Sequence, residues 1–339
     1  MNLPKLSGMF SFPCTHPYRK FFCPNPTSFA LISTDRTIKI YNVGENNYEL
    51  AATLTGAEGP VWQVSWCHPM FGVILAACSF DGSVILYRET RPRDWSILYS
   101  AKNLHQSSVN SLCFAPPEWG LMVAAASSDG KVSILSLQDD NSWSVDYIND
   151  NPLGVNSVSW SPSGGYSLTG TESEGGGSDG VEADGGAEGS SGSSEQPRLV
   201  TGGCDNQIRF WVQQSETGEW VEDQSNTVST DSSASASHGD WVRDVAWAPL
   251  ILPDVNMVAS CSEDGTVIVW SQNGKGEPWT GHLLHTFPGP VWRVSWSETG
   301  HILAVSSGDA DVVLFKKGLD GVWHQMDTLK DEAPESAQQ

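Results

Sequence analysis

Two groups of side chains in this sequence have residue types that could support catalysis. The first, Gly176-Gly177-Ser178-Asp179-Gly180, fits the G-x-S-x-G pattern of a nucleophilic serine, which needs a strand before it and a helix after it. Here the pattern lies within Ser163 to Gln196, a tract of glycine, serine and acidic residues with too little apolar surface to offset its ordering entropy. We predict a disordered loop there, so a hydrolase that uses Ser178 is the weakest hypothesis.

The second group is His238 and Asp240, which could act as an acid/base pair. Both residues come directly before the apolar run Val242 to Trp247. At that place they are better interpreted as side chains that fix the turn into a strand. We therefore predict no catalytic residue, and no enzymatic activity.

A metal site is suggested by Cys14, His16 and Cys23, but no fourth ligand is evident and the spacing fits no standard zinc module. We predict neither a metal site nor a cofactor.

Five of the seven cysteines fall in or beside apolar runs, as reduced and buried cysteines do. This placement favours the cytosol or the nucleus. The five are Cys67, Cys78, Cys113, Cys204 and Cys261.

Six aspartates could be taken for a carboxylate array, but each occupies the same place in a repeat: Asp35, Asp81, Asp129, Asp205, Asp264 and Asp309. Six copies of one structural turn is the simpler interpretation. Where no insertion intervenes, successive aspartates are about 45 residues apart, close to the ~40–45 residues of one WD40 propeller blade.

The elements that position these turns are short apolar runs. In the clearest unit the runs are Val61 to Trp66, Ile74 to Ser79 and Val84 to Tyr87, and Asp81-Gly82 separates the last two. Such runs predict neighbouring antiparallel strands joined by tight turns. Six such units predict an all-β, six-bladed propeller over residues 29–329, with insertions at 163–196 and 225–237, a divergent segment at 1–28 and a flexible tail at 330–339.

The two ends of this ring are predicted to be unsealed. The last unit takes its fourth strand, Val322 to Leu329, from its own end of the chain, and nothing before Phe29 resembles the first strand of the other units. An unsealed ring leaves strand edges with which another chain could pair. The candidate residues of this seam are Ala30, Ile32, Ile38, Ile40, Val291, Val294, Val312 and Leu314.

Tryptophans occur near the start or at the end of the first predicted strand in several units. Alternation places Trp66, Trp160, Trp247 and Trp296 on one side, where core packing is the simplest interpretation. Another three lie at strand starts and are candidate rim contacts for a partner: Trp62, Trp241 and Trp292.

The net charge of −22 argues against direct binding to nucleic acid or to an anionic membrane surface.

Several phrases in these units closely resemble the SEC-thirteen family of WD40 proteins. They are GPVWQVSWCHPMFG at Gly59 to Gly72, SSVNSLCFAPPEWGL at Ser107 to Leu121, GGCDNQIRFW at Gly202 to Trp211, HGDWVRDVAWAP at His238 to Pro249, and PVWRVSW at Pro290 to Trp296. One departure is Ala57-Glu58 after Gly56, where the family has Gly-His. The resemblance covers about residues 30–328 and implies an open six-bladed propeller that a partner completes with a donated blade.

The resemblance also implies a function and partners. The function is that of a non-enzymatic scaffold of the COPII outer coat, in vesicle budding from the endoplasmic reticulum to the Golgi, and of the nuclear pore Y-complex. The implied partners are a SEC-thirty-one type coat subunit, a solenoid nucleoporin and a vacuolar or lysosomal nutrient-signalling coat-like complex, with membrane association through partners alone. The alternative is a WD40 adaptor that reads peptides through its top rim or central channel.

Overall fold

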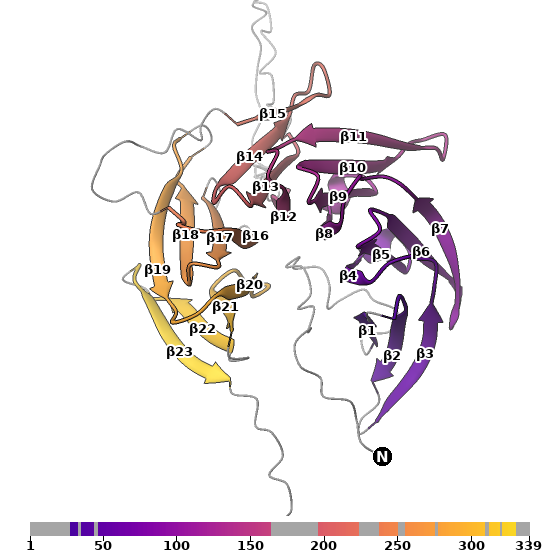
Figure 1. Ribbon diagram of the computed structural model, residues 1–339, viewed down its shortest axis with the longest axis horizontal. Coiled ribbons are helices and arrows are strands. Elements are labelled where there is room, and N and C mark those ends of the chain that lie inside the picture. Colours follow the sequence, from indigo (N-terminus) through magenta and orange to yellow (C-terminus); the bar gives the residue numbers. More distant parts are fainter. Residues whose placement is uncertain are drawn as a thin grey trace, which may run out of the picture.

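The computed structural model describes residues 28–32, 35–43, 47–163, 196–223, 237–249, 255–274, 277–308, 312–318 and 321–329. These residues form antiparallel β-sheets and two short 3-10 helices, η1 (Pro69–Phe71) and η2 (Pro117–Trp119). Six sheets follow one another around a common axis in chain order (Figure 1), and we call them blades 1 to 6. The predicted all-β WD40 propeller architecture is confirmed.

Blade 1 has three described strands and every other blade has four, paired in chain order. Blade 1 contains β1 (Ser28–Ile32), β2 (Ile38–Val43) and β3 (Tyr48–Leu54). Blade 2 contains β4 (Val61–Trp66), β5 (Ile74–Ser79), β6 (Val84–Arg91) and β7 (Asp94–Ala101), and blade 3 contains β8 (Val109–Phe114), β9 (Met122–Ser127), β10 (Lys131–Leu137) and β11 (Trp143–Asn149).

The remaining strands repeat this order. Blade 4 contains β12 (Val155–Trp160), β13 (Arg198–Gly203), β14 (Ile208–Gln213) and β15 (Trp220–Glu222). Blade 5 contains β16 (Val242–Trp247), β17 (Asn256–Ser262), β18 (Thr266–Gln272) and β19 (Thr280–Thr286). Blade 6 contains β20 (Val291–Trp296), β21 (Ile302–Ser307), β22 (Val312–Lys317) and β23 (Trp323–Leu329).

The first strand of each four-stranded blade lies innermost, and each contacts its successor from β4 through β8, β12 and β16 to β20 (Figure 1). All five inner strands begin with valine, end with an aromatic residue and carry a β-bulge at the second residue. Within the described residues blade 1 lacks this strand, because β1 and β2 flank the Asp35 turn as β5 and β6 flank the Asp81 turn.

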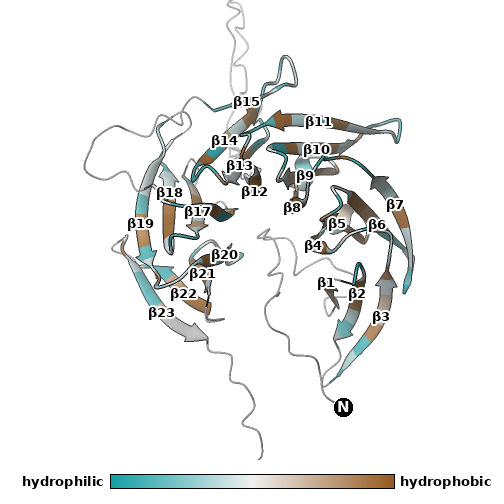
Figure 2. Cartoon of the chain, viewed as in Figure 1, coloured by the Kyte–Doolittle hydropathy of each residue, from teal (hydrophilic) through white to brown (hydrophobic). Residues whose placement is uncertain are grey.

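The hydrophobic core lies between adjacent blades. In β5 the side chains alternate between the two sheet faces, so that Ile74 and Ala76 pack toward blade 3 while Leu75 and Ala77 pack toward blade 1. Both faces of such a strand are buried, which explains its continuous apolar run. Figure 2 shows the hydrophobic colour concentrated on strands such as β5, β6 and β12, whereas the outer strands β19 and β23 carry hydrophilic segments.

Three sequence expectations fall largely or wholly outside the described residues. They are the segment at 1–28, of which Ser28 alone is described as the first residue of β1, and the insertions at 163–196 and 225–237. The tail at 330–339 and Ser178 also lie outside them. Within the described part of the chain, no helix has the length and hydrophobicity needed to cross a membrane.

Candidate functional site

The repeated aspartates hold the turns of the blades. The Asp81 carboxylate accepts hydrogen bonds from the backbone N–H of Ser83 at 2.9 Å, and from those of Glu58 at 2.6 Å and Gly59 at 3.0 Å. One carboxylate thereby fixes its own turn and the loop that enters the inner strand. Burial alone would raise the pKa of Asp81, but these hydrogen bonds outweigh it and lower the pKa below its ordinary value.

The same arrangement recurs at two further turns. Asp129 accepts from the N–H groups of Lys131 and Gln106, and Asp264 accepts from those of Thr266 and Gly239. Asp35 accepts from Thr37 and Asp205 accepts from Gln207, whereas Asp309 lies outside the described residues. These hydrogen bonds give the aspartates a structural part, as the turn interpretation predicts.

His238 is a buried structural residue rather than half of an acid/base pair. Its Nε2 lies 2.7 Å from Ser260 Oγ and its Nδ1 lies 2.8 Å from Thr266 Oγ1. Ser260 Oγ in turn accepts from the indole N–H of Trp270 at 2.8 Å. Burial lowers the pKa of His238 to about 4, against a smaller opposing effect of Asp264. Asp240 instead accepts from the backbone N–H of Trp241.

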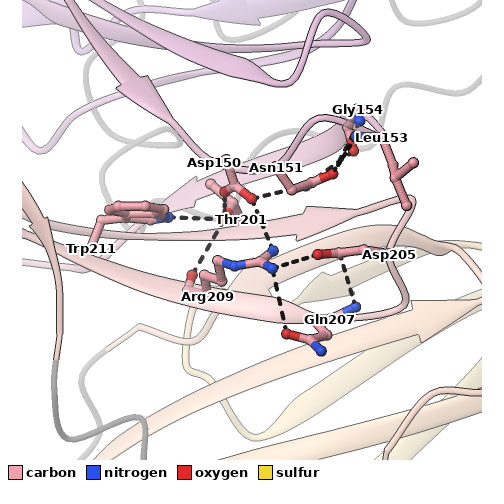
Figure 3. Close-up of polar contacts among 9 residues, drawn as sticks. All are labelled: Asp150, Asn151, Leu153, Gly154, Thr201, Asp205, Gln207, Arg209 and Trp211. Carbon is pink, nitrogen blue, oxygen red and sulfur yellow. Dashed lines mark hydrogen bonds and ion pairs between the residues drawn. The ribbon is translucent and has the colours of Figure 1, made fainter.

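Blade 4 builds the corresponding network without histidine, as Figure 3 shows. The Trp211 indole N–H donates to Thr201 Oγ1 at 3.1 Å, and that hydroxyl donates to Asp150. The Asp150 side chain is 1% exposed and pairs with the Arg209 guanidinium at 3.0 Å, which also pairs with the turn residue Asp205. A buried carboxylate is tolerated here because an arginine and a hydroxyl donate to it.

Blade 2 also lacks the histidine, since Ala57 and Glu58 follow Gly56. The hydroxyl of Tyr87 donates to the Thr55 carbonyl oxygen at 3.2 Å, and Tyr87 is buried. Burial raises the pKa of Tyr87 to about 12, with a smaller contribution from the negative charge of Asp81. The tyrosine therefore ties β6 to the loop equivalent to the one in which blade 5 carries its histidine.

The predicted rim tryptophans do not form one set. Trp241 and Trp292 are 43% and 44% exposed, and the Arg243 guanidinium lies 5.2 Å and 5.1 Å from their ring centroids. Arg243 also pairs with Glu263. Trp62 is less exposed, because its indole N–H donates to Ser108 Oγ at 2.9 Å. Trp241 precedes its strand, so Arg243 holds the position that Trp62 and Trp292 occupy in β4 and β20.

Most of the predicted seam residues are packed inside the ring. Ile38 and Ile40 are buried against blade 2, and Ala30 and Ile32 pack on the same cluster. Val291 and Val294 are buried against blade 5. These residues are apolar because they fill the contacts between blades, so they offer little surface to another chain. Val312 and Leu314 are partly exposed.

On each of the two end blades, one face is covered by no other blade among the described residues, and it consists of the residues that alternate with the buried ones. In blade 1, Phe29 stacks on Tyr41 at 5.4 Å between ring centroids and contacts Tyr48 edge-on, and Leu50 pairs with Tyr41 across the sheet. In blade 6, Ala304 pairs with Leu314 and Ser306 with Val312. We call the first group the blade 1 end face, and its residues are Phe29, Leu31, Tyr41, Tyr48 and Leu50. The blade 6 end face consists of Ile302, Ala304, Ser306, Val312 and Leu314.

These end faces are more exposed than their counterparts inside the ring. All six residues of β5 are buried, whereas all five residues of β1 are partly exposed and the end-face residues of β21 alternate with the buried Leu303 and Val305. On blade 1, Tyr48 is 72% exposed and Leu50 is 48% exposed. Exposed apolar residues grouped on one sheet face are typical of an interaction surface.

The chain also matches known proteins over most of its length. Residues 64–163 match the model of the anaphase-promoting complex subunit 4 WD40 domain, and residues 232–271 and 281–316 match the WD domain, G-beta repeat. The sequence is 42% identical over 311 residues to a protein SEC13 homolog of Drosophila melanogaster, covering 91% of this chain and 80% of that protein. This chain belongs to the SEC13 family.

Other SEC13 relatives agree with this assignment. Identity is 38% over 304 residues with the protein transport protein SEC13 of Yarrowia lipolytica, covering 89% of this chain and 92% of that protein. It is also 38% over 311 residues with the protein transport protein sec13 of Emericella nidulans, covering 89% and 91%. The resemblance found in the inner-strand phrases is thereby confirmed.

Sequence reasoning missed the Asp150–Arg209 pair and the place of Arg243 in this SEC13 family chain. A signal for the pair was present, because Asp205 and Arg209 flank one turn and Asp150 lies beside Asn151, which holds the position of the histidines that precede the inner strands of blades 3 and 5. No comparable signal marks Arg243, whose stacking between two tryptophans depends on how blades 5 and 6 lie beside each other.

Proposed function

We propose that this SEC13 family chain is a non-enzymatic scaffold for protein transport, and that it acts in the COPII outer coat and in the nuclear pore Y-complex. Its location is then the cytoplasmic face of the endoplasmic reticulum, COPII vesicles and the nuclear pore. The names of two relatives, protein transport protein SEC13, support the transport role. The polar networks of the described blades support a non-enzymatic scaffold role, because their carboxylates and histidines form hydrogen bonds and ion pairs that stabilise the blades.

We further propose that a solenoid partner binds by donating a β-blade between blades 1 and 6. The observation that supports this proposal is the exposure of the two end faces. Their apolar residues are partly exposed, whereas the opposite faces of the same strands are buried. A donated sheet would cover both faces as neighbouring blades cover each other. Fully burying an exposed leucine contributes about 1.5–3 kcal/mol, so covering the exposed part of Leu31 or Leu314 would contribute a fraction of that. The proposed partners are a SEC-thirty-one type coat subunit, a solenoid nucleoporin and a nutrient-signalling coat-like complex.

The experiment is binding of a purified three-stranded blade fragment from the SEC-thirty-one type subunit to the full chain. We expect the fragment to bind and to raise the melting temperature. Leu314→Glu should weaken binding by about a hundredfold, because a carboxylate would be buried in an apolar contact. The matched control is Leu283→Glu, since Leu283 is 56% exposed on the outer strand β19. The proposal fails if saturating fragment gives neither binding nor a thermal shift.

A second candidate function is peptide recognition at the rim, and the exposed pair Trp241 and Trp292 around Arg243 favours it. Alanine at Trp62, Trp241 and Trp292 distinguishes the two. Loss of partner binding in this triple variant, with the melting temperature retained and with Leu314→Glu still binding, would favour the rim over the end faces.

A further inference from the structure

The inner strands are linked to one another by the side chains at their bulges. The third residue of the inner strand follows the bulge in all five blades, and these residues are Gln63, Ser111, Ser157, Asp244 and Arg293. Because the strands follow one another around the axis, equivalent residues face the same direction along the ring. Their chemistry can therefore be compared position by position.

Three of these residues accept a hydrogen bond from the fourth residue of the next inner strand. The Leu112 N–H donates to Gln63 Oε1 at 3.2 Å, linking β4 to β8. The Val245 N–H donates to Ser157 Oγ at 3.3 Å, linking β12 to β16. The Val294 N–H donates to Asp244 Oδ2 at 3.1 Å, linking β16 to β20. In these three links the earlier strand supplies the acceptor to its successor, which gives the ring a direction.

The second residues of the inner strands reach in the same direction. The Asn110 side-chain amide donates to the Val155 carbonyl oxygen at 2.9 Å, and that of Asn156 donates to the Val242 carbonyl oxygen at 2.9 Å. Trp62 likewise donates to Ser108, which directly precedes β8. The starts of β4, β8 and β12 therefore project polar atoms toward the following strand.

At the last inner strand this pattern changes. Arg293 occupies the third position of β20, and an arginine side chain has donors and no acceptor. Its side chain is 44% exposed, and Trp292 before it is also 44% exposed, whereas Asp244 at the same position of β16 is buried. Arg293 forms an ion pair with Asp244 at 3.8 Å between Nη1 and Oδ1, a distance too long for a hydrogen bond.

Asp244 is already supplied with donors. Its Oδ1 accepts from Ser157 Oγ at 2.7 Å and from the Val245 N–H at 3.1 Å, and its Oδ2 accepts from Val294. The Arg293 guanidinium has only this long ion-pair contact to Asp244 and stays 44% exposed on the last described inner strand, so a strand placed beside β20 could reach its donors.

We propose that Arg293 selects a partner strand that carries an aspartate or glutamate opposite it. The inference rests on the proposed function, because the strand belongs to the donated blade. A strand placed beside β20 would cover the guanidinium, and a covered charge is costly unless an acceptor of opposite charge bonds to it. A carboxylate at the bulge of the donated strand would do so while also accepting a backbone N–H, as Asp244 does for Val245.

The test uses the full chain and the blade fragment described above. Arg293→Glu should weaken binding at least about tenfold, because it places a carboxylate opposite a carboxylate, and Arg293→Gln should weaken it less. The matched control is Arg93→Glu, an equal charge change at an exposed arginine on the loop between β6 and β7. That control should bind within about twofold of the unaltered chain. Melting temperatures of the isolated variants verify that each is folded.

The complementary arm changes the fragment. Each Asp and Glu of its inner strand is replaced in turn by Lys, and one of these variants should restore binding to Arg293→Glu. The inference is overturned if Arg293→Glu binds as well as the unaltered chain, or if no fragment variant restores binding; the proposed function survives either outcome. If the unaltered chain does not bind the fragment, both are overturned.

Discussion

His238 should make the stability of blade 5 depend on pH in a calculable way. Its side chain is 1% exposed and its two ring nitrogens are engaged with Thr266 and Ser260. Burial lowers its pKa to about 4, whereas an unfolded histidine titrates near about 6.5. Because the folded pKa is the lower one, the neutral ring favours folding above about pH 6.5, and this contribution is lost as the pH falls toward about 4.

The magnitude follows from the two pKa values. Between about pH 7.5 and about pH 5, the unfolded chain gains a proton that the folded chain does not, which lowers the free energy of unfolding by about 2 kcal/mol. His238→Gln removes the titrating group, so the loss of stability over this pH range should be about 2 kcal/mol smaller in the variant than in the unaltered chain.

The assay is urea denaturation of both proteins at the two pH values, followed by tryptophan fluorescence. His238→Gln will itself be less stable at about pH 7.5, because it cannot reproduce both hydrogen bonds, at a cost of about 1–3 kcal/mol. This offset cancels in the comparison between pH values. The matched control is His301→Gln, at an exposed histidine. Equal pH dependence in His238→Gln and the unaltered chain would refute the reasoning.

Three further outcomes are expected. Gly265→Ala should destabilise by about 2–4 kcal/mol in urea denaturation, because φ is +81° and the new methyl would lie 2.5 Å from a carbonyl oxygen; Gly72→Ala, at φ +90° with open space, should cost about 1 kcal/mol. Arg209→Met should cost about 3–5 kcal/mol by leaving the Asp150 carboxylate buried and uncompensated, and adding Asp150→Asn should recover part of that loss. Burial raises the pKa of the Cys78 thiol to about 12, so iodoacetamide at about pH 8 should label it in urea and leave it unlabelled in the native chain, as peptide mass spectrometry would report.

Each of these three predictions has a contradicting result. Equal costs for the two glycine variants would show that the carbonyl contact has no energetic consequence. A double variant less stable than Arg209→Met would show that the arginine does not compensate the carboxylate. Labelling of the cysteine without urea would show that its strand opens readily in the native state.

The strands and turns of this chain follow from local sequence. The runs around Asp81 and Asp264 predict their strands closely, because alternation and the Asp-Gly turn depend on residues that are near one another in the chain. The SEC13 family could be assigned from short phrases for the same reason, and four of the five phrases contain an inner strand with a buried first valine, a bulge and a terminal aromatic residue.

The tertiary structure decides which face of a strand meets which neighbour. Ile40 and Leu314 look equivalent in the sequence, yet Ile40 is buried against blade 2 and Leu314 faces away from blade 5. Alternation defines two faces of a sheet but does not say which of them another blade covers, because that depends on ring order. Ring order also decides the burial of two residues at the same strand position. Asp244 is buried because β20 lies beside its strand, whereas Arg293 on β20 is 44% exposed.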